Sequence, residues 1–203
     1  IGQLSKLCKE IQDISMSLRM IPVKTTLQKM NRIVRDTSKT LNKKVQLTLR
    51  GEETEIDKTV LEHLADPLVH IVRNAVDHGL ESTEGRVEAG KTEQGKVDIS
   101  AYHEGNNLVI EVSDDGKGID PDVIRRKAIE KGVLNPNSVV SDQEVIQYIF
   151  HPGFSTKDQV SEVSGRGVGM DVVKTNIEKL SGDVRVDTRL GKGSTFKIVL
   201  PLT

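Results

Sequence analysis

The stretch Leu61–Gly79 constrains the fold of this chain most, because it combines two helical faces of opposite chemistry. One face is apolar and recurs every three or four residues, which is the spacing of a helix packed against a core. Its members are Leu61, Leu64, Leu68, Ile71, Val72 and Ala75. The other face has the same spacing but is polar: His63, Asp66, His70, Arg73, Asn74 and Asp77, with His78 just beyond. The sequence therefore predicts a long helix that supports a core on one side and offers polar groups on the other.

The polar face has an unusual composition for a helix in solvent. No Lys or Glu lies between Glu62 and Glu81, and Asn74 is a poor helix former. His70, Asn74 and His78 are four residues apart, so an α-helix places them in one column. An Asn carbonyl beside imidazoles suits a hydrated divalent cation and phosphate oxygens. The alternative is an ordinary solvated face, which is the correct interpretation of most polar stripes.

Composition excludes several classes of protein. The chain has 203 residues, enough for one core with an extension. Its 29 basic and 30 acidic residues nearly cancel and form no basic tract, so nucleic acid is not an expected partner. Cys8 is the single cysteine, which excludes an internal disulfide and is typical of a reducing, cytoplasmic location. No apolar run approaches the roughly 20 residues of a membrane span, so no membrane insertion is expected.

The hydrophobic periodicity predicts an α/β chain. Helices are expected around residues 4–18, 23–41, 61–79, 121–131, 141–150 and 168–180, and strands around 45–50, 96–103, 107–113, 184–188 and 195–200. This order predicts a two-layer α/β sandwich, in which helices cover one face of a mixed sheet, plus an N-terminal helical extension. Residues 80–95 are expected to form a loop or a short helix, and His151–Gly167 a mobile loop. Pro67 predicts a bend in the central helix, or a new helix capped by Asp66.

The N-terminal segment carries a separate pattern. Apolar residues in steps of three and four form a seam of the coiled-coil kind: Leu4, Leu7, Ile11, Ile14, Leu18 and Ile21. The alternative is a helix that lies on its own domain. The chain begins within this pattern, without a methionine or a signal peptide, and ends directly after a strand. We therefore interpret it as a piece of a longer protein.

Gly85–Thr92 satisfies the phosphate-binding pattern G-x-x-x-x-G-K-[ST] letter for letter. Such a loop works only between a buried strand and a helix whose N-terminal amides face the phosphates. Here a helix end precedes the segment and a strand follows it. We therefore reject the phosphate-loop interpretation, and place Lys91 on a surface loop with no part in nucleotide binding.

Two other glycine motifs are better placed. Asp114-x-Gly116-x-Gly118 follows a strand, where an Asp can accept a hydrogen bond from an exocyclic amine and glycines admit a flat ring. Alone it is weak, and an Asx turn is the alternative. Gly165-Arg166-Gly167-Val168-Gly169 leads into a helix, whose N-terminal amides can hold an anion. A flexible hinge is the alternative there.

The order of these motifs resembles a known family. H-x-x-x-N-A-x-x-H-G, D-x-G-x-G, G-F-S-T and G-R-G-V-G follow one another, beginning at His70. This order resembles the ATP-binding domain shared by gyrase, MutL, the ninety-kilodalton heat-shock chaperones and histidine kinases. Within that superfamily the chain is similar to the chemotaxis histidine kinases, most specifically in S-G-R-G-V-G-M-D-V-V-K at residues 164–174. The resemblance covers residues 19–203 and implies the Bergerat-type ATP-binding fold.

The resemblance implies a role for each matched position. The residues that would bind ATP are Asn74, Asp77, His78, Asp114, Gly116, Gly118, Lys127, Ser155, Thr156, Gly165, Gly167 and Gly169. Asn74 and His78 would hold Mg²⁺ at the phosphates, and Asp114 would hold the adenine amine. His70 and Arg73 would be catalytic. His70 stands where gyrase-like members have a water-activating glutamate, which suits transfer of a phosphoryl group to histidine better than hydrolysis.

The resemblance also implies partners. The acceptor box H-E-x-x-x-P-L of orthodox histidine kinases is absent, so the acceptor histidine would lie in a separate domain. Residues 1–20 would be the end of a dimerisation helix and its linker, and residues 21–203 the catalytic domain. The full protein would be a homodimer that works with a coupling protein, chemoreceptors and response regulators. Two alternatives stay open: an ATP-hydrolysing clamp of the gyrase or MutL kind, and a catalytically silent nucleotide-dependent scaffold.

Overall fold

The computed structural model describes residues 2–154 and 169–202. Its helices are α1 (Gly2–Arg19), α2 (Lys24–Thr40), α3 (Lys58–Asn74), the π-helical turn η1 (Ala75–Gly79), α4 (Thr83–Glu88), α5 (Pro121–Glu130), α6 (Asp142–Ile146), the 3₁₀ turn η2 (Gln147–Phe150) and α7 (Met170–Lys179). Its strands are β1 (Met20–Pro22), β2 (Lys44–Arg50), β3 (Glu55–Asp57), β4 (Gln94–Glu104), β5 (Asn107–Asp114), β6 (Asp183–Arg189) and β7 (Gly193–Pro201). The helices and strands predicted within these ranges are confirmed, whereas β1 and β3 are too short to have been predicted.

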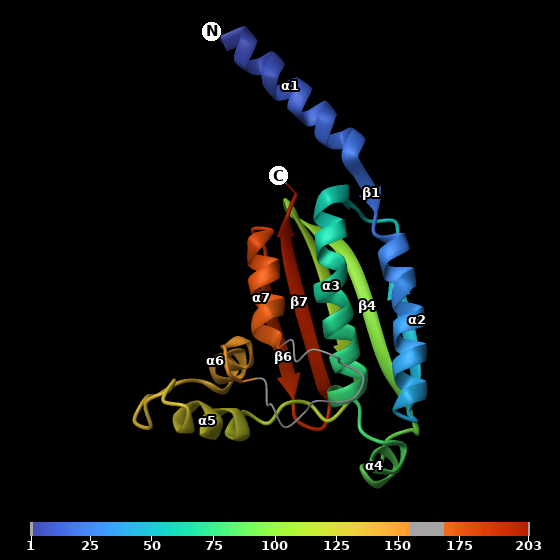
Figure 1. Ribbon diagram of the computed structural model, residues 1–203, viewed down its shortest axis with the longest axis vertical. Helices are drawn as coiled ribbons and strands as arrows, with labels where there is room; N and C mark the ends of the chain where they lie inside the picture. The colour runs from blue at the N-terminus through green and yellow to red at the C-terminus, as the bar shows by residue number, and fades with distance from the viewer. Residues whose placement is uncertain (1, 155–168, 203) are drawn as a thin grey trace.

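Five of these strands form a mixed sheet with α2, α3 and α7 on one face (Figure 1). The strand order is β2-β4-β5-β7-β6, in which β2 and β4 are parallel and the other neighbours antiparallel. β1 and β3 form a separate antiparallel pair. The predicted two-layer α/β sandwich with a mixed sheet is confirmed.

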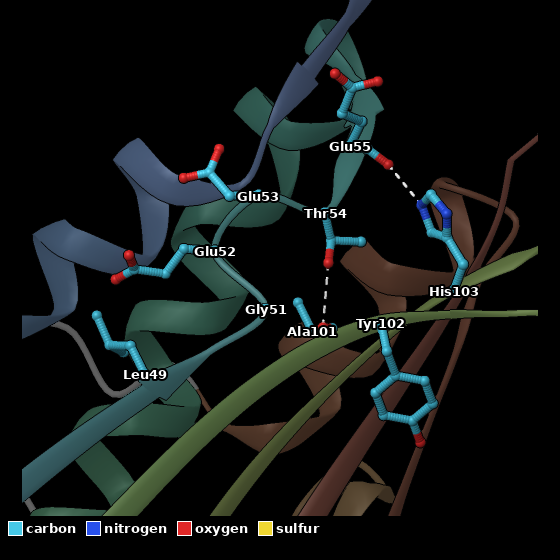
Figure 2. A pocket seen from close by; sticks show the side chains of 9 residues that line it. All are labelled: Leu49, Gly51, Glu52, Glu53, Thr54, Glu55, Ala101, Tyr102 and His103. Atoms are coloured by element: carbon cyan, nitrogen blue, oxygen red, sulfur yellow. Dashed lines mark hydrogen bonds between the residues drawn. The ribbon is translucent and has the colours of Figure 1, made fainter.

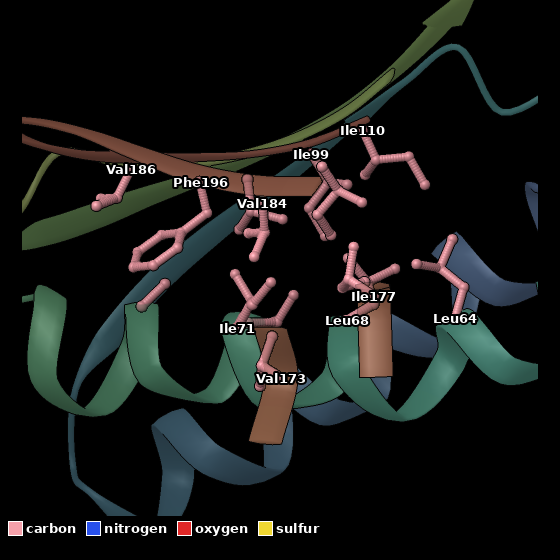
Figure 3. Close-up of a cluster of buried hydrophobic side chains, with 14 of the residues drawn as sticks. Leu64, Leu68, Ile71, Ile99, Ile110, Val173, Ile177, Val184, Val186 and Phe196 are labelled. Atoms are coloured by element: carbon pink, nitrogen blue, oxygen red, sulfur yellow. The ribbon is translucent and has the colours of Figure 1, made fainter. Parts of the chain in front are cut away.

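The core lies between this sheet and the helices, as Figure 3 shows. Burial alternates along β4 and β7, so that one face of each strand is buried. The side chains of this face meet the apolar stripe of α3, including Leu64, Leu68 and Ile71, and Val173 and Ile177 of α7 (Figure 3). The stripe predicted for the central helix is therefore the surface on which the sheet packs.

α3 differs from the sequence prediction at its start and at Pro67. The side chain of Asp57 caps it by accepting from the amide of Thr59 at 2.8 Å. The helix continues through Pro67 to Asn74, so the predicted new helix start capped by Asp66 is wrong. Packing against the sheet holds this helix together despite the hydrogen bond that proline cannot donate.

α1 extends away from the sheet, and Figure 1 shows it as a projecting helix. Its apolar side chains are exposed: Leu4 69%, Leu7 52%, Ile11 59% and Ile14 62%. The predicted helical extension is confirmed, and the alternative of a helix packed on its own domain is wrong over these four residues. The coiled-coil pairing of this seam stays a prediction. Within the described ranges, no helix combines the length and apolar character that a membrane crossing demands.

Candidate nucleotide site at the ends of α3 and β5

The C-terminal end of α3 continues into η1, where the amide of Leu80 donates to the carbonyl of Ala75 at 2.9 Å. This five-residue spacing marks a π-helical turn, a feature that is frequent at functional sites. It changes the helical phase after Asn74, so His78 does not follow the α-helical column predicted from the sequence. Instead the Nε2 atom of His78 lies 3.6 Å from Oδ2 of Asp77.

Lys43, which precedes β2, hydrogen-bonds to the backbone of the π-helical turn. Its ammonium donates to three carbonyls: Val76 at 2.9 Å, Asp77 at 2.6 Å and Leu80 at 2.8 Å. Burial lowers the pKa of Lys43, and the nearby Asp77 carboxylate opposes that shift. Because helix ends leave carbonyls without donors, Lys43 fixes the segment that carries Asp77 and His78.

Lys43→Met is expected to lower the free energy of unfolding by about 3 kcal/mol, because partly buried carbonyls lose their charged donor. Urea unfolding at neutral pH measures the change. Lys44→Met is the matched control: Lys44 is exposed and pairs with Glu93 on the surface, so its loss should leave the free energy of unfolding almost unchanged. Equal losses from the two substitutions would contradict this role for Lys43.

Asn74 lies against the start of α7. Its Nδ2 atom donates to Sδ of Met170 at 3.0 Å, which joins two motifs that are 96 residues apart. Gly169 is the N-cap of α7, and among the described residues no side chain caps this end. The structure thus brings Asn74 of the polar face to the helix N-terminus predicted as an anion cradle.

Asp114 ends β5 and is buried, with 9% of its surface exposed. Burial raises the pKa of its carboxyl from 3.8 to about 6, while hydrogen bonds from the amides of Gly116 and Ser194 act in the opposite direction. The Gly116 amide donates to Oδ1 at 2.9 Å. This is the hydrogen bond of an Asx turn, which was the alternative interpretation of the motif Asp114-x-Gly116-x-Gly118. Among the described residues no cation is in direct contact with this buried carboxylate, which suits a neutral hydrogen-bond donor such as an exocyclic amine.

The glycines around Asp114 are required by close backbone packing. A Cβ atom on Gly116 would lie 1.9 Å from the carbonyl oxygen of Gly79, and one on Gly79 would lie 2.8 Å from Oδ2 of Asp114. Gly118 has a φ of +73°, and its Cβ atom would lie 2.5 Å from the carbonyl oxygen of Arg189. These contacts bring the end of β5 directly against η1. Their predicted role in admitting a flat ring stays a prediction.

His70 and Arg73 lie half-buried on the same helix, one turn before η1. Burial lowers the pKa of His70, Arg73 lowers it further, and Asp66 opposes them. This shift favours the neutral form of the His70 imidazole. The Nε atom of Arg73 is buried and has no hydrogen-bond partner among the described residues.

The remaining predicted residues fall into two groups. Lys127 lies half-buried on α5, with its role in phosphate contact still a prediction. Ser155, Thr156, Gly165 and Gly167 lie outside the described residues, as does most of the predicted mobile loop.

The segment that matches the phosphate-loop pattern has a different structure from a phosphate loop. It comes after η1, begins within α4 and leads into β4, as the sequence order predicted. Its two basic side chains, however, are not on an open surface. Arg86 is 2% exposed, and the Lys91 side chain is 19% exposed. Lys91 lies on a loop, as predicted, but its side chain is not in open solvent, because its ammonium reaches back to the turn after Asp114.

The donor set of the site fits Mg²⁺ held mainly by phosphate. In the described part of the chain, no three His, Cys, Asp or Glu side chains gather in a way that could hold a metal ion. Mg²⁺ usually keeps few protein ligands and takes others from substrate phosphates and water. The Asn74 side chain, next to the N-terminus of α7, could supply one such ligand.

A groove of about 760 Å³ lies elsewhere (Figure 2). Its lining includes Gly51, Thr54 and Ala101–His103. In the sheet Ala101 pairs with Ile110, whereas Asp114 pairs with Val97, so the groove and the candidate site lie toward opposite ends of these strands. His103 is tied across the groove by a 2.8 Å hydrogen bond from Nε2 to the carbonyl of Glu55.

Sequence reasoning missed several residues of the site. Lys43 and Ser194 carry no local signal, since a lone lysine before a strand and a serine within one are common. Glu81 lies two residues beyond the motif H-x-x-x-N-A-x-x-H-G, which ends at Gly79. Arg86 and Lys91 lie within the segment whose phosphate-loop interpretation was rejected. This segment therefore contributes residues to the site, although it is not a phosphate loop.

The fold and the site together define a class of protein. The chain belongs to the family of histidine kinase-, DNA gyrase B-, and HSP90-like ATPases, whose family model matches residues 63–203. Membership of this family supports ATP binding by the chain.

Particular relatives are more informative. The chain is 52% identical over its full length to the chemotaxis protein CheA of Borreliella burgdorferi, of which it covers 23%. It is 51% identical to the sensor histidine kinase CheAY of Helicobacter pylori, of which it covers 26%, and 46% identical to CheA of Bacillus subtilis, of which it covers 30%. The chain thus spans less than a third of each of these three relatives.

Solved structures support the fold. The catalytic domain of histidine kinase ThkA has a TM-score of 0.55 at 17% identity, and the comparison covers 91% of this chain and 95% of that domain. The Acinetobacter baumannii histidine kinase AdeS has a TM-score of 0.53 at 16% identity, covering 100% of this chain and 81% of that one.

Proposed function

We propose that this chain is the ATP-binding catalytic domain of a chemotaxis histidine kinase, which transfers the γ-phosphoryl group of ATP to a histidine on a separate domain. The observation that carries the proposal is the meeting of three sequence motifs at one end of the sheet. Asp114 packs against the turn at Gly79, and Asn74 of the preceding helix touches the first residue of α7. The similarity to CheA relatives along the whole chain supports the same activity.

Each group then has a role in the transfer. Asp114 accepts a hydrogen bond from the adenine amine, and the amides at the start of α7 face phosphate oxygens. Asn74 and His78 hold Mg²⁺, which when bound neutralises charge on the phosphates. Gly116 and Gly118 line the base, and Asp77, Lys127, Ser155, Thr156, Gly165, Gly167 and Gly169 complete the set that contacts the nucleotide.

The neutral state of His70 supports its role toward the incoming histidine. A neutral imidazole can orient the target ring or accept the proton that this ring loses when it is phosphorylated. Arg73, whose buried Nε lacks a partner among the described residues, would donate to a phosphate oxygen. Positioning and charge neutralisation then account for most of the catalysis.

The domain division and the partners belong to the same proposal. Residues 1–20 are the end of a dimerisation helix with its linker, which the exposed apolar side chains of α1 support. Residues 21–203 are the catalytic domain. In the full protein the chain works in the cytoplasm, as part of a homodimer with a coupling protein, chemoreceptors and response regulators.

A transfer assay with a separate acceptor domain tests the activity. The chain incubated with Mg²⁺ and labelled ATP is expected to hydrolyse ATP slowly and not to label itself. Addition of a purified helical domain that carries an acceptor histidine should produce acid-labile, base-stable phosphate on that domain. The rate should be low, because nothing tethers the two domains and raises their effective concentration.

Three outcomes would contradict the proposal. Stoichiometric self-labelling of any of the five histidines would show that the acceptor is internal. Rapid hydrolysis without labelled acceptor would indicate an ATP-hydrolysing clamp. ATP binding with neither hydrolysis nor transfer would indicate a nucleotide-dependent scaffold.

A further inference from the structure

Four charged residues form a partly buried cluster behind the turn that follows Asp114. We call Glu81, Arg86, Lys91 and Asp115 the charged brace. The Arg86 guanidinium pairs with both carboxylate oxygens of Asp115, with Nη1–Oδ1 at 3.1 Å and Nη2–Oδ2 at 3.0 Å. It also reaches Oε1 of Glu81 at 3.3 Å, and its Nε donates to the carbonyl of Thr92 at 2.7 Å. Such a planar, bidentate pair orients its carboxylate partner more strictly than a point charge would.

Lys91 connects this pair to the backbone of the turn. Its Nζ atom donates to Oε2 of Glu81 at 2.6 Å, to the carbonyl of Asp115 at 3.0 Å and to the carbonyl of Gly116 at 2.7 Å. The ammonium has three hydrogens, so these contacts use its full capacity. Burial acts to raise the pKa of Glu81, but the hydrogen bond from Lys91 and the nearby charges hold it below its ordinary value.

One peptide unit transmits this contact to Asp114. The carbonyl of Asp115, which Lys91 holds, and the amide of Gly116 belong to the same planar group. That amide donates to Oδ1 of Asp114 at 2.9 Å. Because the peptide plane is rigid, its orientation sets the direction from which the Asp114 carboxylate is hydrogen-bonded. Consecutive hydrogen bonds of this kind also strengthen one another.

We propose that Arg86 and Lys91 are positioning residues for the nucleobase, which determine selectivity for a 6-aminopurine by fixing the orientation of Asp114. The proposal deepens the function proposed above and rests on it. The segment that resembles a phosphate loop thus acts on the base end of the nucleotide, through the protein backbone and without contact with phosphate.

The test compares two nucleotides that differ at the group which Asp114 recognises. Dissociation constants of ATP and inosine triphosphate, which has a keto oxygen in place of the amine, are measured by calorimetry for the wild type and Lys91→Met. We expect Lys91→Met to weaken ATP binding roughly tenfold, as loss of a supporting hydrogen-bond partner commonly does. Binding of inosine triphosphate should be unchanged, so the preference for ATP should fall by the same factor.

Two further variants make the result specific. Lys96→Met removes the same charge from an exposed position near this turn and should leave both constants unchanged. In an Asp114→Asn background, Lys91→Met should have no further effect on ATP binding, since the two act through one contact. If Lys91→Met does not fold, Lys91→Gln, which removes the charge but keeps an NH₂ donor group, is measured in its place.

The outcomes separate this inference from the proposed function. Equal weakening of both nucleotides, or no change in either, would overturn the brace while leaving ATP binding at Asp114 intact. A wild-type chain that binds ATP and inosine triphosphate equally would overturn the assignment of Asp114 itself, and the brace with it.

Discussion

Asp114→Asn is expected to lose between about tenfold and 100-fold in affinity for ATP, while the chain becomes more stable. The loss follows from the geometry of the carboxylate. The Gly116 amide already donates to Oδ1, so an Asn side chain would keep its oxygen there. Its NH₂ group would then occupy the place of Oδ2 and face the adenine amine, donor against donor.

The gain in stability follows from the pKa of Asp114, which burial raises from 3.8 to about 6. A raised carboxyl pKa means that the folded state holds its proton more tightly than the unfolded state. Stability therefore falls as the pH rises from about 4 to about 6, and the difference in pKa corresponds to about 3 kcal/mol at pH 7. Asn carries no charge, so the variant should gain between about 1 and 3 kcal/mol above pH 6 and much less near pH 4.

Urea unfolding at pH 5, 6 and 8, together with ATP titration at pH 8, checks both parts. Asp187→Asn makes the same chemical change at an exposed position of β6 and should alter neither quantity. The explanation fails if the stability difference between wild type and Asp114→Asn is independent of pH, or if the variant binds ATP as tightly as the wild type.

Asn74→Ala is expected to reduce phosphoryl transfer by about 100-fold or more, because the Mg²⁺ at the phosphates loses a protein ligand. The fold should persist. Asn74 is half-buried, and its contact with Met170 is a weak hydrogen bond to sulfur. Alanine is also the better helix former, so the free energy of unfolding should change by less than about 1 kcal/mol.

Transfer to an acceptor domain across a Mg²⁺ titration measures the effect, and circular dichroism checks the fold. Asn31→Ala on α2 is the matched control, since Asn31 is an exposed helical residue far from the site in sequence. Full transfer by Asn74→Ala would remove the end of α3 from the active centre.

The helices, the strands and the candidate motifs could be predicted from the amino-acid sequence. The apolar stripe of Leu61–Gly79 has the period of a helix, and Lys96–His103 that of a half-buried strand, because each period reflects burial of one face of a local element. Asp114 and Asn74 were also predictable from their positions. Asp114 stands at a strand end before glycines, and Asn74 stands on a polar helical face that has no Lys or Glu.

The tertiary structure alone decided what holds these residues in place. Lys43 reaches carbonyls 33 to 37 residues away, and Lys91 reaches backbone 24 and 25 residues away. Neither contact produces a periodic pattern in the sequence. A lysine that hydrogen-bonds buried carbonyls cannot be distinguished by residue type from a lysine in solvent. The phase change at η1 was hidden for a similar reason: the wider turn is stabilised by contacts from Lys43 and the end of β5, which lie outside the helix that it alters.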